Sequence, residues 1–294
     1  KHRIAQTKQY THDSRQKCHD ETECPQGTDY KVKAIMKKVI FALSLLLVGV
    51  TSCDNQEDTD NGITEDNYPK VSFSKIQLSE DSPFEVGVPT VTTTQTYSYN
   101  QGKVTDFTTL QTYTVAGEKA GMKSVTTITY NDNHQVIVTD DYGNVSTYTF
   151  NDKGYATKCV RQEAVTTRTY TFSYLINTEN KYYLKKITES LDEGKIYSSI
   201  DIDYESYRTL RITQKVDTHE QKYTATTSSG NEIANLSEIP CLFLAEMYPM
   251  SLHSAALYGK LLGEPLETLI TQIIPDGNTG NNETTHYSYK TNNE

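Results

Sequence analysis

A short unit recurs along this chain: an aromatic strand end, a turn rich in Asn, Asp and Gly, and then a new strand. Two copies align directly, in residues 130–136 (YNDNHQV) and 150–156 (FNDKGYA), and a shorter copy occupies residues 99–104. Asn and Gly accept the positive φ angles that tight hairpin turns need. Because such turn signals come roughly every ten residues, the pattern predicts consecutive antiparallel hairpins in an up-and-down meander.

Between the turns, apolar and polar residues alternate with the period of two that is typical of a β-strand. Residues 200–205 alternate Ile or Tyr with Asp or Glu, and residues 147–150 and 169–174 alternate Tyr or Phe with Thr or Ser. Such alternation predicts antiparallel sheets with one dry and one wet face. The aromatic face would comprise Tyr148, Phe150, Tyr170, Phe172 and Tyr174. It is read first as core packing, and alternatively as a Tyr-lined groove for a glycan, peptide or lipid, although the absence of Trp weakens the glycan case.

The region 239–263 is the most aliphatic part of the chain after residue 53. Within it, residues 255–262 suit a short helix with Gly263 as the C′ residue, and the whole region could cover the inner face of a curved sheet. Strands are expected at 269–274 and 285–289. The chain stops where a partner strand would begin, which suggests a truncated C-terminus with an unpaired edge. Residues 70–294 are therefore expected to form one mainly β domain: a curved antiparallel up-and-down meander, or partial barrel, with a short C-terminal helical plug.

The N-terminal part has the features of an export signal. The first Met is Met36; Lys37 and Lys38 follow it, and residues 39–50 are almost entirely apolar. A helix of a dozen residues is roughly 18 Å long and cannot span the ~30 Å hydrocarbon core, so residues 36–52 are expected to be a signal peptide. The Val-Thr-Ser-Cys sequence ending at Cys53 resembles the lipobox of bacterial lipoproteins. That resemblance implies a diacylglyceryl group on the Cys53 thiol and cleavage just before it, with residues 1–35 as mis-assigned upstream sequence.

An acidic segment follows Cys53. Residues 54–67 hold six acidic residues and no basic ones, so residues 53–69 are expected to form a flexible tether. Its start, residues 56–58 (QED), resembles the acidic export signals of surface-displayed lipoproteins; a plain solvated linker facing the periplasm is the alternative. Removing residues 1–52, which hold nine basic and five acidic residues, changes the formal net charge from −10 to −14. This charge argues against nucleic acid as a partner and leaves the acyl chains to hold the protein at the membrane.

Motifs that carry chemistry are scarce. Cys159 and Cys241 could form a disulfide or remain small buried residues. The spacing of Ser251 and His253 brings a Ser–His pair to mind, but no Gly-x-Ser-x-Gly elbow accompanies it. Surface or turn positions are expected for His134, His219, His253 and His286.

Acidic pairs and turns suit structural roles better than catalytic or metal-binding ones. Asp201 and Asp203, like Asp140 and Asp141, are expected on a solvated face rather than as a catalytic dyad. The Asn- and Asp-rich turns at 131–133 and 151–152 could offer oxygen ligands to calcium, but they lack the EF-hand pattern. No catalytic residue, metal site or cofactor is therefore predicted, and Cys53 is the one predicted modification site.

Several features together resemble an uncharacterised family of envelope lipoproteins, catalogued as a domain of unknown function with a porin-like fold. They are the lipobox, the acidic tether, the Tyr- and Thr-rich strands with their turns, and the segment from Tyr248-Pro249 to Tyr258-Gly259. The resemblance covers about residues 70–294 and implies a curved antiparallel sheet or partial barrel, with no functional residues to carry over. The strands look short and lack sustained lipid-facing apolar alternation, so no pore is expected.

The sequence as a whole predicts a non-catalytic, lipid-anchored outer-membrane protein that serves as a binding or structural module, with a glycan, peptide or envelope protein as partner. One alternative is an envelope hydrolase acting on glycan or peptide; another is a lipid or lipoprotein carrier. A concave face filled by residues 240–263 would favour a scaffold, an open Tyr-lined groove would favour binding, and a carboxyl pair flanking a cleft would favour catalysis.

Overall fold

A computed structural model describes residues 3–9, 42–47, 68–71, 75–81, 91–115, 118–131, 134–191, 194–206, 208–227, 232–277 and 284–292. Its strands are β1 (Arg3–Gln9), β2 (Ala42–Leu47), β3 (Lys75–Asp81), β4 (Val91–Asn100), β5 (Lys103–Val115), β6 (Glu118–Asn131), β7 (Gln135–Thr139), β8 (Val145–Phe150), β9 (Ala156–Gln162), β10 (Thr167–Ile176), β11 (Tyr182–Ser190), β12 (Ile196–Ser206), β13 (Thr209–Val216), β14 (His219–Thr226), β15 (Gln272–Pro275) and β16 (Thr285–Asn292). The helices are α1 (Leu242–Glu246), the 3₁₀-helix η2 (Met250–His253) and α2 (Ser254–Tyr258).

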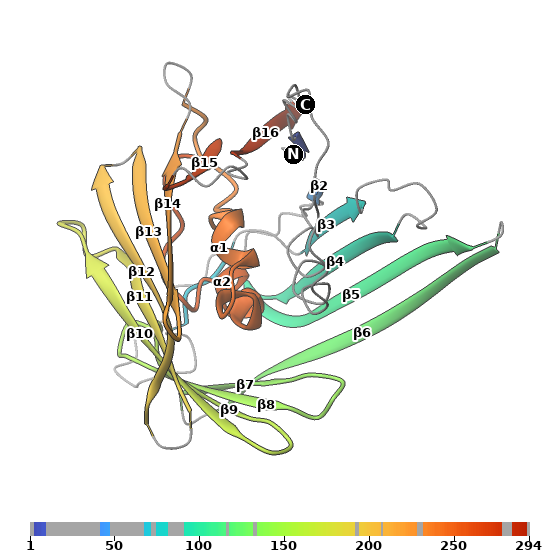
Figure 1. The fold of residues 1–294 in the computed structure, drawn as a ribbon. Coiled ribbons are helices and arrows are strands. Elements are labelled where there is room, and N and C mark those ends of the chain that lie inside the picture. Colours follow the sequence, from blue (N-terminus) through green and yellow to red (C-terminus); the bar gives the residue numbers. More distant parts are fainter. Residues whose placement is uncertain are drawn as a thin grey trace, which may run out of the picture.

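Strands β3 to β16 form a 14-strand antiparallel meander in which each strand pairs with the next in sequence. In the described chain β2 adds to β3 and β1 adds to β16, so the same sheet holds all sixteen described strands. The sheet is not closed. It curves strongly, with β10–β14 on one side, β4–β6 on the other, and α1 and α2 between them (Figure 1). The predicted up-and-down meander with a C-terminal helical plug is confirmed. Two strands are longer than the sequence suggested: β5 has 13 residues and β6 has 14, and they extend outward together.

The predicted N-terminal segments lie largely outside the described residues. Cys53 is among the residues that are not described, as is nearly all of the tether 53–69. Strand β1 falls in residues 1–35 and pairs with β16, whereas β2 falls in residues 36–52 and pairs with β3. Because β16 pairs with β1, the unpaired edge that the sequence suggested at the last strand is not found in this structure, and that expectation is wrong. Cleavage before Cys53 would remove both β1 and β2. The division into leader, signal peptide and tether stays a prediction.

The recurring turn has one local cause. The side-chain Oδ1 of Asn151 accepts hydrogen bonds from the backbone N–H groups of Lys153 and Tyr155, both at 3.0 Å. The same pair of bonds recurs in the turns that begin at Asp140 and Asn177. The fourth residue of each turn has a positive φ: 78° at Gly143, 79° at Gly154 and 59° at Asn180. The Asx side chain thus replaces backbone partners that a strand would supply, which ends one strand and starts the next.

The core lies between the inner face of the sheet and the plug, residues 239–263. Fully buried side chains from the sheet meet fully buried side chains from the plug; they include Tyr97, Tyr148, Tyr170, Ile187, Ile200 and Ile212 from the strands, and Met250 and Leu261 from the plug. The ring of Tyr258 stacks on that of Tyr97 at 4.3 Å between centroids. The apolar plug therefore supplies the buried layer that a one-sided sheet needs.

Two details of the C-terminal region differ from the sequence prediction. Helix α2 ends at Tyr258 with Gly259 as its C-cap, so Gly263 is not the C′ residue. Gly263 instead has φ of +106° where the chain passes β11, and a Cβ there would lie 2.8 Å from the carbonyl oxygen of Tyr182. Strand β15 starts at Gln272, three residues later than predicted, because Leu269 and Ile270 are buried in the preceding loop. No helix in the described part of the chain is long and apolar enough to cross a membrane.

Candidate functional site

The aromatic face predicted from the alternation is covered by the plug. Tyr148, Tyr170 and Phe172 are at most 6% exposed, and the ring of His253 lies edge-on to all three, 4.3–5.7 Å away between centroids. Phe150 and Tyr174 are partly buried against the same core. Core packing, the first reading of this stripe, is confirmed, because the plug occupies the concave face over these residues.

His253 is the residue that the sequence analysis placed wrongly. It is 1% exposed rather than at the surface, and its Nδ1 lies 2.6 Å from the hydroxyl of Tyr148. Burial, with a smaller effect of the nearby Arg161 charge, lowers its pKa to about 3, so the ring is neutral at neutral pH. Its position between Leu252 and Ala255, in the most aliphatic part of the chain, was the signal for burial.

The exposure of the other histidines and of Ser251 tests two further predictions from the sequence. His134, His219 and His286 are exposed, as predicted. Ser251 is also exposed whereas His253 points into the core, so the structure does not bring these two side chains together as a catalytic pair.

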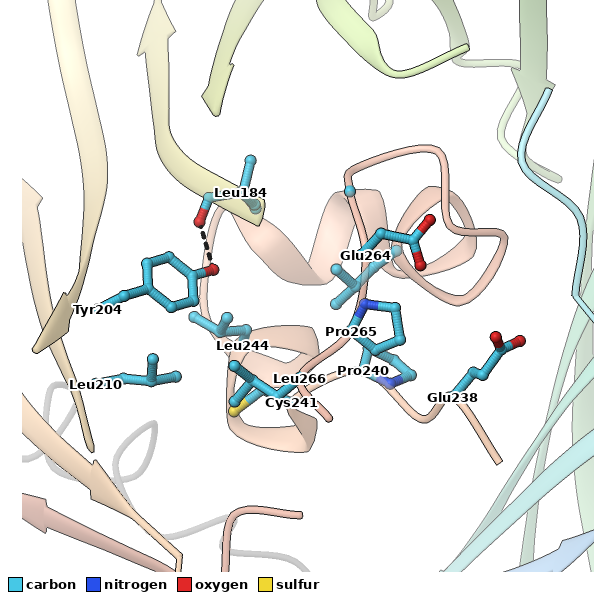
Figure 2. Close-up of a pocket in the computed structure, with 12 residues that line it drawn as sticks. Leu184, Tyr204, Leu210, Glu238, Pro240, Cys241, Leu244, Glu264, Pro265 and Leu266 are labelled. Carbon is cyan, nitrogen blue, oxygen red and sulfur yellow. Dashed lines mark hydrogen bonds between the residues drawn. The ribbon is translucent and has the colours of Figure 1, made fainter. Parts of the chain in front are cut away.

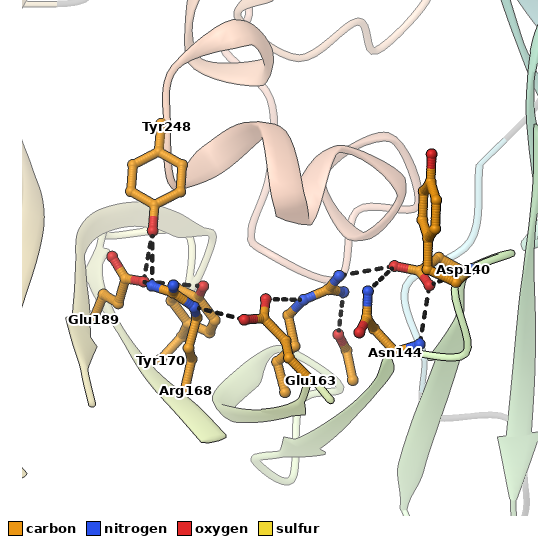
Figure 3. A network of polar contacts seen from close by, with 10 residues as sticks. Asp140, Asn144, Glu163, Arg168, Tyr170, Glu189 and Tyr248 are labelled. Carbon is orange, nitrogen blue, oxygen red and sulfur yellow. Dashed lines mark hydrogen bonds and ion pairs between the residues drawn. The ribbon is translucent and has the colours of Figure 1, made fainter. Parts of the chain in front are cut away.

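A polar network joins the plug to the sheet (Figure 3). At its centre the carboxylate of Glu189 on β11 is fully buried and accepts hydrogen bonds from Arg168 at 2.6 Å and from the Tyr248 hydroxyl at 2.7 Å. The hydroxyls of Tyr170 and Ser198 also donate to it. One carboxylate on β11 thus connects β10, β12 and the plug. Each of these four side chains donates a hydrogen bond to it.

The network continues from Arg168 along the inner face. Arg168 also pairs with Glu163 at 3.1 Å, and Arg161 pairs with Glu163 at 3.0 Å and with Asp140 at 2.8 Å. Although burial opposes ionisation, hydrogen bonds from Asn144 and Arg161 lower the pKa of Asp140, and hydrogen bonds from Arg161 and Arg168 lower that of Glu163. A glycosidase needs one carboxyl with a raised pKa to act as general acid. These two carboxylates have the opposite shift, which favours a structural role.

The two acidic pairs differ in outcome. Asp141 is exposed as predicted, but Asp140 is half-buried against Arg161, so the solvated-face prediction is wrong for Asp140. Asp201 pairs with Lys186 at 2.7 Å and Asp203 is exposed, whereas Ile200 and Ile202 between and beside them are buried. The solvated-face reading is confirmed for this pair. Asp141 accepts a hydrogen bond from the backbone N–H of Val125 at the edge of β6.

Neither cysteine is bonded to the other. Cys159 is buried between Tyr148 and Tyr170, its partners on the neighbouring strands, and Cys241 is half-buried at the start of α1; both are free thiols. Burial raises the pKa of Cys159 to about 12 and that of Cys241 to about 11, so neither is a reactive thiolate at neutral pH.

In the turns that could have offered oxygen ligands to calcium, the side-chain oxygens instead accept hydrogen bonds from backbone N–H groups. The amide oxygens of Asn131 and Asn151 accept hydrogen bonds within their own turns, and Asn133 lies outside the described residues. Among the described residues no group of three or more His, Cys, Asp or Glu side chains could hold a metal ion.

Two adjoining cavities lie beside the ends of β10–β13, one against the plug and the other against the loop that follows it. The inner one, which we call the slot, has a volume of about 30 Å³ and lies between Leu184, Leu210, Cys241, Leu244 and Leu266 (Figure 2). The outer one, which we call the bowl, has a volume of about 410 Å³ and is half-open. The bowl is lined by Leu175, Asn177, Tyr183, Tyr204, Ser206, Leu266, Glu267 and Thr268. Tyr204 and Leu266 line both cavities and separate them.

Fold and interior together define a mainly β protein with an open, up-and-down antiparallel sheet around a helical plug. The sequence profile of a family described as a domain of unknown function (DUF4595) with porin-like fold matches residues 97–294, and the chain belongs to this family. The chain is also similar to the crystal structure of a porin-like protein from Bacteroides uniformis, with 56% identity and a TM-score of 0.69. That match covers 75% of this chain and 86% of the other. No curated protein matches. The family resemblance inferred from the sequence is confirmed.

Proposed function

We propose that this chain is a lipid-anchored protein of the outer membrane whose β domain is a non-catalytic binding or structural module. The filled concave face is the observation that supports a non-catalytic role for the β domain. The plug's own side chains occupy the space where a substrate would lie, and Glu189 fixes the plug to three strands. The lipobox ending at Cys53 supports the anchor, and membership in a family with a porin-like fold supports a place in the cell envelope.

The two alternatives have less support. A hydrolase would need a carboxyl able to donate a proton beside an open cleft, but the inner carboxylates are paired with arginines. A lipid carrier would need a long apolar channel. The slot behind the bowl has room for about one water molecule. A wider cavity of about 840 Å³ between β13–β14 and β15–β16 is lined mostly by polar residues, among them Arg208, Thr226 and Gln272, which does not suit an acyl chain.

Metabolic labelling with a fatty-acid analogue tests the anchor. The full chain should become labelled and fractionate with membranes, whereas Cys53→Ala should be unlabelled. Cys241→Ala is the matched control, since it removes a thiol that is not in the lipobox, and it should be labelled like the unmodified chain. Protease added to intact cells should degrade the labelled protein if it is displayed at the surface. An unlabelled protein that retains Met36 to Ser52 would overturn the proposal.

A further inference from the structure

The bowl has the size and lining of a site for one aromatic group. Its volume of about 410 Å³ falls within the usual range of small-molecule pockets, roughly 300–1,000 Å³. A sealed apolar cavity of about 150 Å³ already binds benzene, so the bowl has room for a bicyclic ring with its substituents. Half of its lining residues are apolar or aromatic: Leu175, Tyr183, Tyr204 and Leu266.

Tyr183 and Tyr204 form an aromatic wall of the bowl. Their ring centroids are 5.7 Å apart and the rings are inclined at 56°, so a third ring could contact one face-on and the other edge-on. Tyr204 is held in place because its hydroxyl donates to the carbonyl oxygen of Leu184 at 2.8 Å. This wall is therefore formed before any ligand arrives, which lowers the cost of binding.

The limited depth of the bowl favours a compact ring over an extended acyl chain as its ligand. Behind Tyr204 and Leu266 the space narrows to the slot of about 30 Å³, which holds about one water molecule. A flat, compact group can fill the bowl, whereas an extended acyl chain has nowhere to continue.

Charge at the rim restricts the ligand further. Glu267 lines the bowl, and Lys181 lies between Glu267 at 2.8 Å and Glu179 at 3.0 Å. Two carboxylates thus surround one ammonium, and the chain as a whole carries a net charge of −10. An anionic ligand would be repelled, and a neutral or cationic one would not.

We propose that the bowl binds an uncharged or cationic aromatic group, presented by a peptide side chain or by a free aromatic molecule. This proposal deepens the binding role given above and rests on it. Acylation of Cys53 is not needed for the bowl to form, so failure of the labelling experiment would leave ring binding unaffected, and loss of ring binding would leave the anchor unaffected.

The absence of Trp from this chain gives a direct assay. N-acetyl-tryptophanamide can be excited selectively, and its emission should shift to shorter wavelength in a saturable way when the purified full chain is added. Tryptophanamide, which is cationic, should bind at least as well, and the anion N-acetyl-tryptophan should bind several-fold more weakly. A Gly-Trp-Gly peptide with blocked ends that binds more tightly than the amide would identify a peptide as the ligand. Equal affinity would identify a free aromatic molecule.

Two neighbouring residues of β10 supply a matched pair of variants. Leu175 lines the bowl, and Ile176 follows it on the opposite face of the strand; they are 41% and 49% exposed. Leu175→Asp should weaken binding about tenfold or more, because the ring would then cover a charged group instead of the apolar side chain that lines the bowl. Ile176→Asp should change it less than about twofold, with both variants folded by near-UV circular dichroism. No saturable shift, equal losses for the two variants, or equal affinity for the anion would overturn the proposal.

Discussion

Glu189→Gln is the substitution that most directly tests how the plug is held. The native carboxylate is fully buried and faces four donors, from Arg168, Tyr170, Ser198 and Tyr248. Gln keeps the side-chain volume but loses the negative charge. Its NH₂ group is a hydrogen-bond donor and would face partners that are themselves donors. Removing one partner of a buried ion pair costs about 3–5 kcal/mol. Arg168 keeps Glu163 and is 24% exposed, which places the expected loss near the lower end, about 3 kcal/mol.

Tyr248→Phe isolates the part of this network that belongs to the plug. It removes the hydrogen bond that the hydroxyl donates to Glu189 and the longer one, of 3.2 Å, that it accepts from Arg168. A hydrogen bond to a charged group is worth about 1.5–3 kcal/mol, and because the ring is half-buried we expect a total loss of about 1.5 kcal/mol. Because both changes break the same bond, the double variant should lose about 1 kcal/mol less than the sum of the two single losses.

Urea unfolding followed by circular dichroism measures these losses as shifts of the midpoint at constant slope. Asp203→Asn, on the exposed face of β12, is the control and should stay within about 0.5 kcal/mol of the unmodified chain. If Glu189→Gln is as stable as this control, or if the two changes prove additive, the network does not hold the plug and the reasoning is refuted.

Other predictions concern pH and backbone conformation. Between pH 6.5 and about pH 3 the unfolded chain binds a proton at His253 that the folded chain excludes, so stability should fall as pH drops through this window, and His253→Phe should flatten the urea-midpoint profile there. Because the folded pKa of Glu163 is lowered, its contribution is present above about pH 4.5 and is lost as pH falls further; Glu163→Gln should remove that part of the acid sensitivity, and an unchanged profile would contradict the assignment. Gly263→Ala should destabilise by more than about 2 kcal/mol, because its Cβ would meet backbone 2.8 Å away, whereas Gly143→Ala, with a similar positive φ but open space, should cost about 1 kcal/mol in thermal or urea unfolding.

Much of the candidate site was beyond sequence reasoning because it depends on contacts distant along the chain. Glu189 looks like any polar residue of an alternating strand, but the bulge between Glu189 and Ser190 and the approach of Tyr248 bury it. The bowl likewise combines the ends of β10–β12 with the loop after the plug, which are about 60 to 90 residues apart in sequence. No local pattern marks either feature.

The sequence by itself determined much of the meander, because the hairpins at Asp140, Asn151 and Asn177 depend on turns that their own five residues specify. Alternation then set which side of each strand is dry, and the aliphatic region 239–263 marked the segment that covers that side. Tertiary structure alone decided which polar groups became buried with partners, as for His253 and Glu189, and where the plug left a cavity. The physical reason is range: turns and alternation arise from neighbouring residues, whereas burial and pairing depend on which distant surfaces the curvature of the sheet brings together.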